Sequence, residues 1–215
     1  MNRRTFLLAG AAARGAAGQD IGRKDPAGKD PTGKGVVFGT TVYSSTGFTG
    51  KIYYISSESE LLPRMRESRA VGTLYASSLE VMPQSFTQGF PGITDRREWF
   101  AIDYRAKVWI ARPGLYRFAL LSDDGAKFWI NEKLVIDNDG LHAPLELAGS
   151  ARLSRGLFSF RIAYFQGPRF EVALVFSVRP PGEAWSVFHT DRYLAPAAGE
   201  HPAGEVTEIK RASNW

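Results

Sequence analysis

Two neighbouring carboxylates, Asp123 and Asp124, end an apolar stretch and are followed by Gly125. Such a pair can serve as catalytic acid and base, bind a metal ion, or cap the backbone of a turn. Successive side chains of a regular strand point to opposite faces, so two adjacent aspartates share one ion only where the backbone is irregular. As a turn, Asp would accept backbone N–H bonds and Gly would take a positive φ. The residues alone leave the ion site and the turn both open.

A second acidic segment, DNDG at 137–140, follows within the same region and precedes His142. Its order superficially resembles a calcium loop, but the glutamate that an EF-hand requires further along is missing at the needed spacing. We interpret the segment as a turn after a strand. His142 is a candidate for the edge of a binding site, with a hydrogen-bonded, partly buried histidine as the alternative.

The loop QGPRF, residues 166–170, brings further binding chemistry. The ring of Phe170 could stack on the apolar face of a sugar. The guanidinium of Arg169 could donate paired hydrogen bonds to hydroxyls or carboxylates, although an ordinary exposed loop arginine is the alternative. The tryptophans on or beside predicted strands are interpreted as core or half-buried residues: Trp99, Trp109, Trp129 and Trp185.

Catalysis has little support in the sequence. Glycosidases need two carboxyl groups about 5–5.5 Å or about 6.5–9.5 Å apart across a cleft, an arrangement that adjacent residues do not naturally provide. The chain has no GxSxG, HExxH, P-loop or dinucleotide motif. It also has no cysteine, which excludes thiolate metal sites and cysteine nucleophiles. We therefore expect a protein that is not an enzyme and has no catalytic residues.

The elements that position these residues are predicted to be short strands. From residue 72 onward, apolar stretches alternate with Gly, Pro, Asp and Asn. In LFSFRIAYF, at 157–165, large apolar side chains recur at every second position, which is typical of a sheet with one buried face. No long segment has the 3.6-residue apolar repeat of a helix. The sequence predicts an all-β fold, an antiparallel β-barrel or β-sandwich, with a three-residue hairpin connection in FWI-NEK-LVI.

The N-terminal segment 1–18 has the layout of a secretory signal, with a basic start, a short apolar run and small residues. Arg3 and Arg4 resemble the twin-arginine export pattern. The run is too short to remain as a membrane anchor, so we expect no transmembrane segment in the mature chain and a secreted or periplasmic location. Residues 19–35 are predicted to form a flexible linker.

The remaining chain is divided by composition into three parts. Residues 36–69 are predicted to be an N-terminal extension that packs on the main domain, with a strand hairpin at 36–55 and a short helix within 57–69. Residues 70–190 form the main β-domain, and 191–215 form a small, polar, loosely held tail.

The charge excess does not predict nucleic-acid binding. The chain has 27 Lys and Arg against 22 Asp and Glu, a formal net charge of +5. Removal of the first 18 residues takes away three arginines and leaves 24 against 22. No run of Lys and Arg remains in the sequence to follow a phosphate backbone, so nucleic acid is excluded as the expected partner.

Three stretches in order resemble the PA14 domain: GLYRFALLSDDGAKFWINEKLVIDNDGLH, GSARLSRGLFSFRIAYFQG and RPPGEAW. This family is named after a segment of the anthrax protective antigen and also occurs in yeast adhesins and as an insert in bacterial β-glucosidases. The resemblance covers roughly residues 70–190 and implies a β-barrel or sandwich with binding loops at one end. It also implies that Asp123 and Asp124, joined by a cis peptide, hold a calcium ion that helps bind sugar hydroxyls. The family's further ligand is an Asn, and the matching position here carries Gln166.

Together these observations predict an exported, non-catalytic carbohydrate-binding module with calcium as cofactor and a glycan or polysaccharide as partner. The alternative is a structural or assembly protein of the cell envelope that uses the barrel for contacts with another envelope protein. The predicted metal ligands are Asp123, Asp124 and Gln166. The predicted sugar-binding residues are Asp123, Asp124, His142, Gln166, Arg169 and Phe170.

Overall fold

The computed structural model describes residues 47–211, except for 66–67, 94–95 and 169. The predicted signal and linker, and the first part of the predicted extension, therefore lie outside the described residues. The same is true of Arg169 and of residues 212–215.

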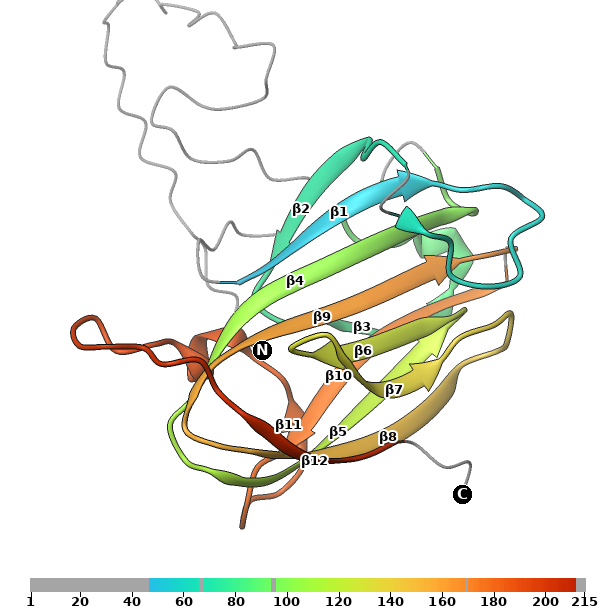
Figure 1. Ribbon diagram of the computed structural model, residues 1–215. Coiled ribbons are helices and arrows are strands. Elements are labelled where there is room, and N and C mark those ends of the chain that lie inside the picture. The colour runs from blue at the N-terminus through green and yellow to red at the C-terminus, as the bar shows by residue number, and fades with distance from the viewer. Residues whose placement is uncertain (1–46, 66–67, 94–95, 169, 212–215) are drawn as a thin grey trace, which may run out of the picture.

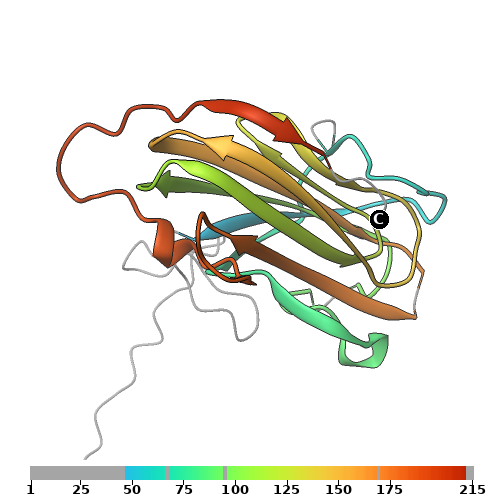
Figure 2. The ribbon, with the colours of Figure 1, turned by 90° about the horizontal axis from the view of Figure 1, so that it is seen from below.

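The strands form two antiparallel sheets that pack face to face (Figures 1 and 2). The first sheet has the order β2-β1-β4-β9-β6-β7. Its strands are β1 Phe48–Tyr54, β2 Gly72–Ala76, β4 Phe100–Ile110, β6 Ala126–Ile130, β7 Lys133–Asn138 and β9 Gly156–Gln166. The second has the order β11-β10-β5-β8-β12, and β3 also pairs with β10. Its strands are β3 Glu80–Ser85, β5 Gly114–Asp123, β8 Leu145–Leu153, β10 Glu171–Arg179, β11 Ser186–Val187 and β12 Val206–Lys210.

This architecture confirms the all-β prediction and identifies the fold as a sandwich of two sheets. The described chain has no α-helix, and its helical turns are η2 Phe86–Gln88 and η3 Thr190–Tyr193. Within the described residues, no helix is long and apolar enough to cross a membrane.

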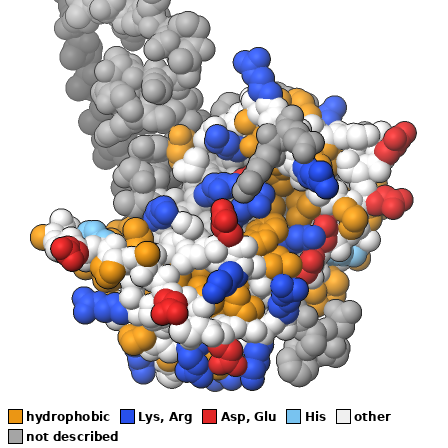
Figure 3. Space-filling view, viewed as in Figure 1, with side chains coloured by type: hydrophobic (Ala, Val, Ile, Leu, Met, Phe, Trp, Pro, Cys, Tyr) orange, Lys and Arg blue, Asp and Glu red, His pale blue; other side chains and the backbone are white. Residues whose placement is uncertain are grey.

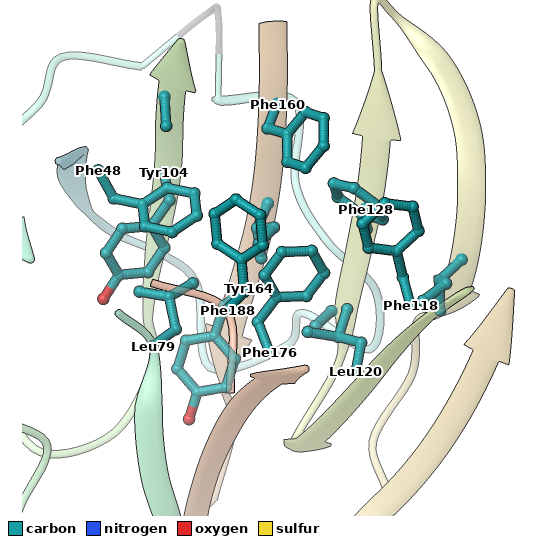
Figure 4. Packing of buried hydrophobic residues seen from close by; sticks show 14 of the residues in the cluster. Phe48, Leu79, Tyr104, Phe118, Leu120, Phe128, Phe160, Tyr164, Phe176 and Phe188 are labelled. Carbon is teal, nitrogen blue, oxygen red and sulfur yellow. The ribbon is translucent and has the colours of Figure 1, made fainter. Parts of the chain in front are cut away.

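The space between the sheets is filled mainly by phenylalanine rings (Figure 4). The alternation in LFSFRIAYF gives the expected result, because Phe158, Phe160, Ile162 and Tyr164 are all buried between the sheets. Phe176 on the opposite sheet contacts several of these rings, with its centroid 4.7 Å from that of Phe128. Burial of such large side chains supplies most of the favourable free energy of folding.

The segment between β1 and β2 covers part of the outer face of the first sheet. Met65 from this segment packs with Tyr53, Ala101, Ala163 and Phe165 in a second, smaller apolar cluster. Phe165, which points away from the main core, is therefore also fully buried. Within the described residues, the rest of this outer face forms an open hollow over β1, β4, β9 and β6.

Several strands differ from the sequence prediction. Residues 72–85, at the start of the predicted run of strands, divide between β2 and β3 in different sheets, and β4 is a single strand of eleven residues. The β6–β7 hairpin has a two-residue turn, because Ile130 pairs with Lys133. Asn131 and Glu132 both have positive φ, the geometry that matches the twist of paired strands.

The two ends of the described chain also differ from expectation. β1 pairs with β2 and β4, while the first half of the hairpin predicted at 36–55 lies outside the described residues. The described residues of 57–69 form turns and irregular structure rather than an α-helix. Near the C-terminus, where a loose tail was predicted, β12 pairs with β8 in the second sheet.

Candidate ligand-binding site at one end of the sandwich

Three strands bring the candidate residues to one end of the sandwich, on the right in Figure 1. β5 ends at Asp123, β7 ends at Asn138, and β9 ends at Gln166. The antiparallel pairing of β5 with β10 places Asp123 opposite Ala173, two residues after β10 begins. The β5–β6, β7–β8 and β9–β10 connections therefore meet.

Asp124 joins these three connections through hydrogen bonds. Its Oδ2 accepts from the backbone N–H of Gly167 at 2.7 Å, and its Oδ1 accepts from the backbone N–H of His142 at 3.1 Å. The side chain of Gln166 donates to Oδ2 as well, at 3.3 Å. The peptide bond between Asp123 and Asp124 is cis. Asp124 is thus a buried crosslink between loops that are far apart in sequence.

The Tyr164 hydroxyl contacts two oxygen atoms at the base of the site. It lies 2.6 Å from the carbonyl oxygen of Asp123 and 2.5 Å from Oε1 of Gln166. A hydroxyl carries a single proton, so it donates fully to only one of these two acceptors. Tyr164 is wholly buried, and its position fixes both the Asp123 backbone and the Gln166 side chain.

The Gln166 amide lies among oxygen atoms. Its Nε2 is 3.1 Å from the carbonyl oxygen of Glu171 and 3.5 Å from that of Pro168, in addition to the Asp124 contact. In this orientation the amide offers its positive end to three acceptors. The oxygens of the β9–β10 connection and of Asp124 therefore converge on one point.

The site carries a buried negative charge. Asp123 and Asp124 are each only 5% exposed, and no Lys or Arg among the described residues forms an ion pair with either. Burial, followed by the neighbouring Asp124 charge, raises the pKa of Asp123 to about 7. Burial also raises the pKa of Asp124, against the opposing effect of its bonds from Gly167 and His142. Two buried carboxylates without a cationic partner favour binding of a proton or a metal cation.

The DNDG segment borders this site, but only Asp139 and Gly140 lie in the connection that was predicted as a turn, because Asp137 and Asn138 are the last residues of β7. Gly140 approaches Gly125 so closely that a Cβ on Gly125 would lie 2.8 Å from the Gly140 nitrogen. The Oδ1 of Asp139 accepts one hydrogen bond from the backbone N–H of Leu62 at 2.8 Å, and its Oδ2 pairs with Lys127 at 3.0 Å. The segment is thereby tied to the β1–β2 connection on one side and to the acidic pair on the other.

His142 contributes to the site through its backbone. Its two ring nitrogens face carbonyl oxygens of its own loop, those of Ala143 at 2.9 Å and Asn138 at 3.1 Å. The ring is therefore engaged with the loop, and the backbone N–H is the group that reaches Asp124.

Phe170 is the most exposed large apolar residue of the described chain, at 80%. Its carbonyl oxygen accepts from the N–H of Phe86, so the backbone of the loop is held while the ring faces solvent. Leu141, from the opposite connection, is partly exposed and lies against Gly167. Arg169 lies outside the described residues.

Two functional groups of this site were not predicted from the sequence, the hydroxyl of Tyr164 and the backbone N–H of Gly167. Tyr164 follows the alternation of buried side chains in β9, which hides the polar role of its hydroxyl. The strand alternation places the Tyr164 ring inside the sandwich, and a buried hydroxyl requires a hydrogen-bond partner. The sequence could therefore have indicated a polar group close to Tyr164 at this end of the sheet.

The fold and the site define the class of this protein. It is an antiparallel β-sandwich with a buried pair of aspartates at one end. Residues 86–187 match the model of the PA14 domain. This segment of the chain is therefore similar to the PA14 domain, and β1 to β3 precede it. No curated protein matched the sequence.

Solved structures with the same fold share little sequence with this chain. The PA14 domain of the MpAFP antifreeze protein is 18% identical, with a TM-score of 0.55 over 70% of this chain and 92% of that one. The PA14 sugar-binding domain from an RTX adhesin is 17% identical, with a TM-score of 0.55 over 69% and 97%. An anti-sigma factor domain-containing protein from Clostridium clariflavum is 18% identical, with a TM-score of 0.55 over 72% of this chain and 48% of that one.

Proposed function

We propose that this protein is a non-catalytic carbohydrate-binding module that recognises sugar hydroxyls at the loop end of the sandwich. The observation that carries the proposal is the buried pair Asp123 and Asp124, held between two loops without a cationic partner in the described chain. Carboxylate oxygens accept hydrogen bonds from sugar hydroxyls or hold a cation that does so. The fold shared with the PA14 sugar-binding domain of an RTX adhesin supports the proposal.

Calcium is the cation we propose for this site, because the available donors are all of the type it prefers. The described residues contain no cluster of three or more His, Cys, Asp or Glu, so two carboxylates would need amide and carbonyl oxygens to complete the shell. Gln166 and the carbonyls of Pro168 and Glu171 are such groups. Bound calcium would supply a Lewis-acidic centre for hydroxyl oxygens.

The Gln166 amide supports the fit, because its opposite orientation would serve a cation equally well. Turned over, Nε2 would donate to the Tyr164 hydroxyl, which would then be free to donate to the Asp123 carbonyl. Oε1 would then face the carboxylate of Asp124, an arrangement that requires a cation between the oxygens. We propose that Gln166 satisfies the oxygens in the metal-free protein and contributes its own oxygen when calcium binds.

Phe170 supplies the apolar contact that sugar recognition usually needs. A sugar ring held by the acidic pair would lie beside the β9–β10 connection, where the exposed Phe170 ring offers a stacking surface. Catalysis has no comparable support, because the adjacent Asp123 and Asp124 share one side of a site rather than flanking a bond. Export of the protein is a proposal that rests on the signal-like residues 1–18.

A role in envelope assembly is the second candidate. It is favoured by the exposure of the apolar side chains of Leu61, Met82 and Phe170, since apolar side chains at the surface can contribute to a protein interface. Concentration-dependent oligomers in size-exclusion chromatography, together with no glycan binding, would support this role over the first.

The test of the first proposal is isothermal titration against a panel of neutral glycans, in calcium and in EDTA. We expect at least one glycan to bind in calcium and Asp124→Asn to abolish that binding. Asp137→Asn is the matched control, because the Asp137 side chain is 47% exposed and pairs only with Lys127 among the described residues. Absence of binding to every glycan under both conditions would overturn the proposal.

A further inference from the structure

A second recognition surface lies on the outer face of the first sheet, where a hollow of about 1130 Å³ opens over β1, β4, β9 and β6. Strand register builds its floor from rungs of neighbouring side chains. One rung crosses β1, β4, β9 and β6, and each of its residues pairs with the next on the neighbouring strand: Thr49, Arg105, Arg161 and Trp129. Lys107 pairs with Ser159 in an adjacent rung. None of these residues belongs to the loop-end site.

The distinctive feature of this floor is that two arginines face each other directly. Like charges opposite each other in a sheet destabilise the pairing. Asp103 partly offsets the repulsion: its Oδ1 accepts from Arg161 Nε at 2.6 Å, and its Oδ2 accepts from Arg105 Nε at 3.0 Å. Lys51, which pairs with Asp103 across β1 and β4, and Lys107 add further positive charge. Four cations, Lys51, Arg105, Lys107 and Arg161, therefore outnumber two carboxylates, Asp103 in the floor and Glu132 in the lining of the hollow.

The cationic groups are held in place before any ligand binds. The guanidinium of Arg161 lies 4.6 Å from the centre of the Trp129 ring, and Lys107 Nζ donates to the Ser159 hydroxyl at 2.7 Å. Arg161 donates to Asp103 through Nε, and its two terminal nitrogens form no hydrogen bond with the described residues. The Arg105 side chain is 55% exposed. Side chains that are already held in position, and that keep unused hydrogen-bond donors, lose less entropy when a ligand binds.

We infer that this hollow binds an acidic polysaccharide through its carboxylates, independently of the loop-end site. Planar guanidinium groups match carboxylates in two-point hydrogen bonds, and the rungs repeat at the spacing of a sheet, which suits an extended chain. Hydroxyl groups of Thr49 and Ser159 lie among the cations and can serve the sugar hydroxyls. Figure 3 shows Lys and Arg side chains in blue over this face, with Asp and Glu side chains in red among them.

Nucleic acid fits the hollow less well than a uronate polymer. Proteins that bind single strands stack bases on open aromatic faces. Trp129, the aromatic side chain of the rung, already carries the Arg161 guanidinium on its face. The ordinary sulfate and phosphate polymers share the negative charge, so the experiment separates them from the carboxylate polymer.

The test titrates the full chain with polygalacturonate, neutral dextran, dextran sulfate and duplex DNA. The variant is Arg105→Gln/Lys107→Gln, which removes two exposed cations and leaves the Arg161–Asp103 pair. The matched control is Arg117→Gln/Lys210→Gln, two exposed cations that both pair with Ser150 on the other sheet. Thermal melting checks that each variant is folded, and Lys51→Gln/Lys107→Gln replaces the first variant if it is not.

We expect wild type to prefer polygalacturonate, and the Arg105/Lys107 variant to lose about tenfold in affinity, since charge-assisted hydrogen bonds are disrupted. The control and Asp124→Asn should bind polygalacturonate as wild type does. Polygalacturonate bound no better than dextran, an equal loss in the control, or a preference for dextran sulfate or DNA would each overturn the inference. Because Asp124→Asn leaves this binding intact, failure of the loop-end proposal would be seen separately.

Discussion

Replacement of Asp123 by asparagine should stabilise the metal-free protein at alkaline pH. Asp123 is buried beside Asp124, and no Lys or Arg of the described chain pairs with it. Asparagine has nearly the same shape but no charge. The substitution therefore removes the cost of a buried carboxylate, and it also removes a proposed calcium ligand.

The magnitude follows from the pKa of this group. Burial and the Asp124 charge raise the pKa of Asp123 from 3.8 to about 7 in the folded protein. The stability that its protonated form contributes is fully present below the unfolded pKa and is lost as the pH rises through the folded pKa. The raised pKa of Asp123 therefore lowers the free energy of unfolding by about 2 kcal/mol at pH 5 and about 4 kcal/mol at pH 8. Asp123→Asn should recover part of each.

Urea unfolding in EDTA, followed by tryptophan fluorescence at pH 5 and pH 8, measures this difference. Asp123→Asn should exceed wild type in free energy of unfolding, and the gain should be larger at pH 8. In calcium the order should reverse, because only wild type gains from the ion. Asp137→Asn, at an exposed position, should show neither effect. A variant no more stable than wild type at pH 8, or equally changed at both pH values, would refute the reasoning.

Three further changes test separate parts of the account. Gln166→Glu adds a third carboxylate among oxygen atoms, so the melting temperature in EDTA should be lower than that of wild type. Adding calcium should raise the melting temperature of this variant more than that of wild type. An unchanged melting temperature under both conditions would contradict this. Phe170→Ala should weaken glycan binding by about fivefold in calorimetry with no change in melting, because the ring is 80% exposed. Gly204→Ala should lower the free energy of unfolding in urea by about 1–3 kcal/mol, because its Cβ would overlap the Phe158 ring.

Much of the fold follows from the sequence because side-chain alternation is a local property. The buried positions of β9 are those at which the apolar residues recur, and the sequence places them correctly. Strand limits were predicted less well. β4 continues through the polar residues at 103, 105 and 107, because its outer face is open there and tolerates charge. The two-residue hairpin turn depends on positive φ at Asn131 and Glu132, which neither residue type requires.

The candidate site was predictable in its acidic centre and less so in its surroundings. Asp123, Asp124 and Gln166 are brought together by the ends of β5 and β9, as the resemblance to the family implied. The contribution of the 137–142 segment depends on close approach of Gly140 to Gly125, a tertiary contact without a local pattern. The Arg105–Arg161 pair requires knowledge of strand register, since the two residues lie far apart in the sequence.

The most direct test of the central claim is to locate the sugar on the protein. Uniformly ¹⁵N-labelled protein in calcium would be titrated with the best-binding neutral glycan, and amide shifts would be followed by NMR. The account predicts the largest changes at the N–H groups of Gly167 and His142, which both donate to Asp124. Changes confined to the outer sheet face around Arg105, with Gly167 and His142 unaffected, would contradict it.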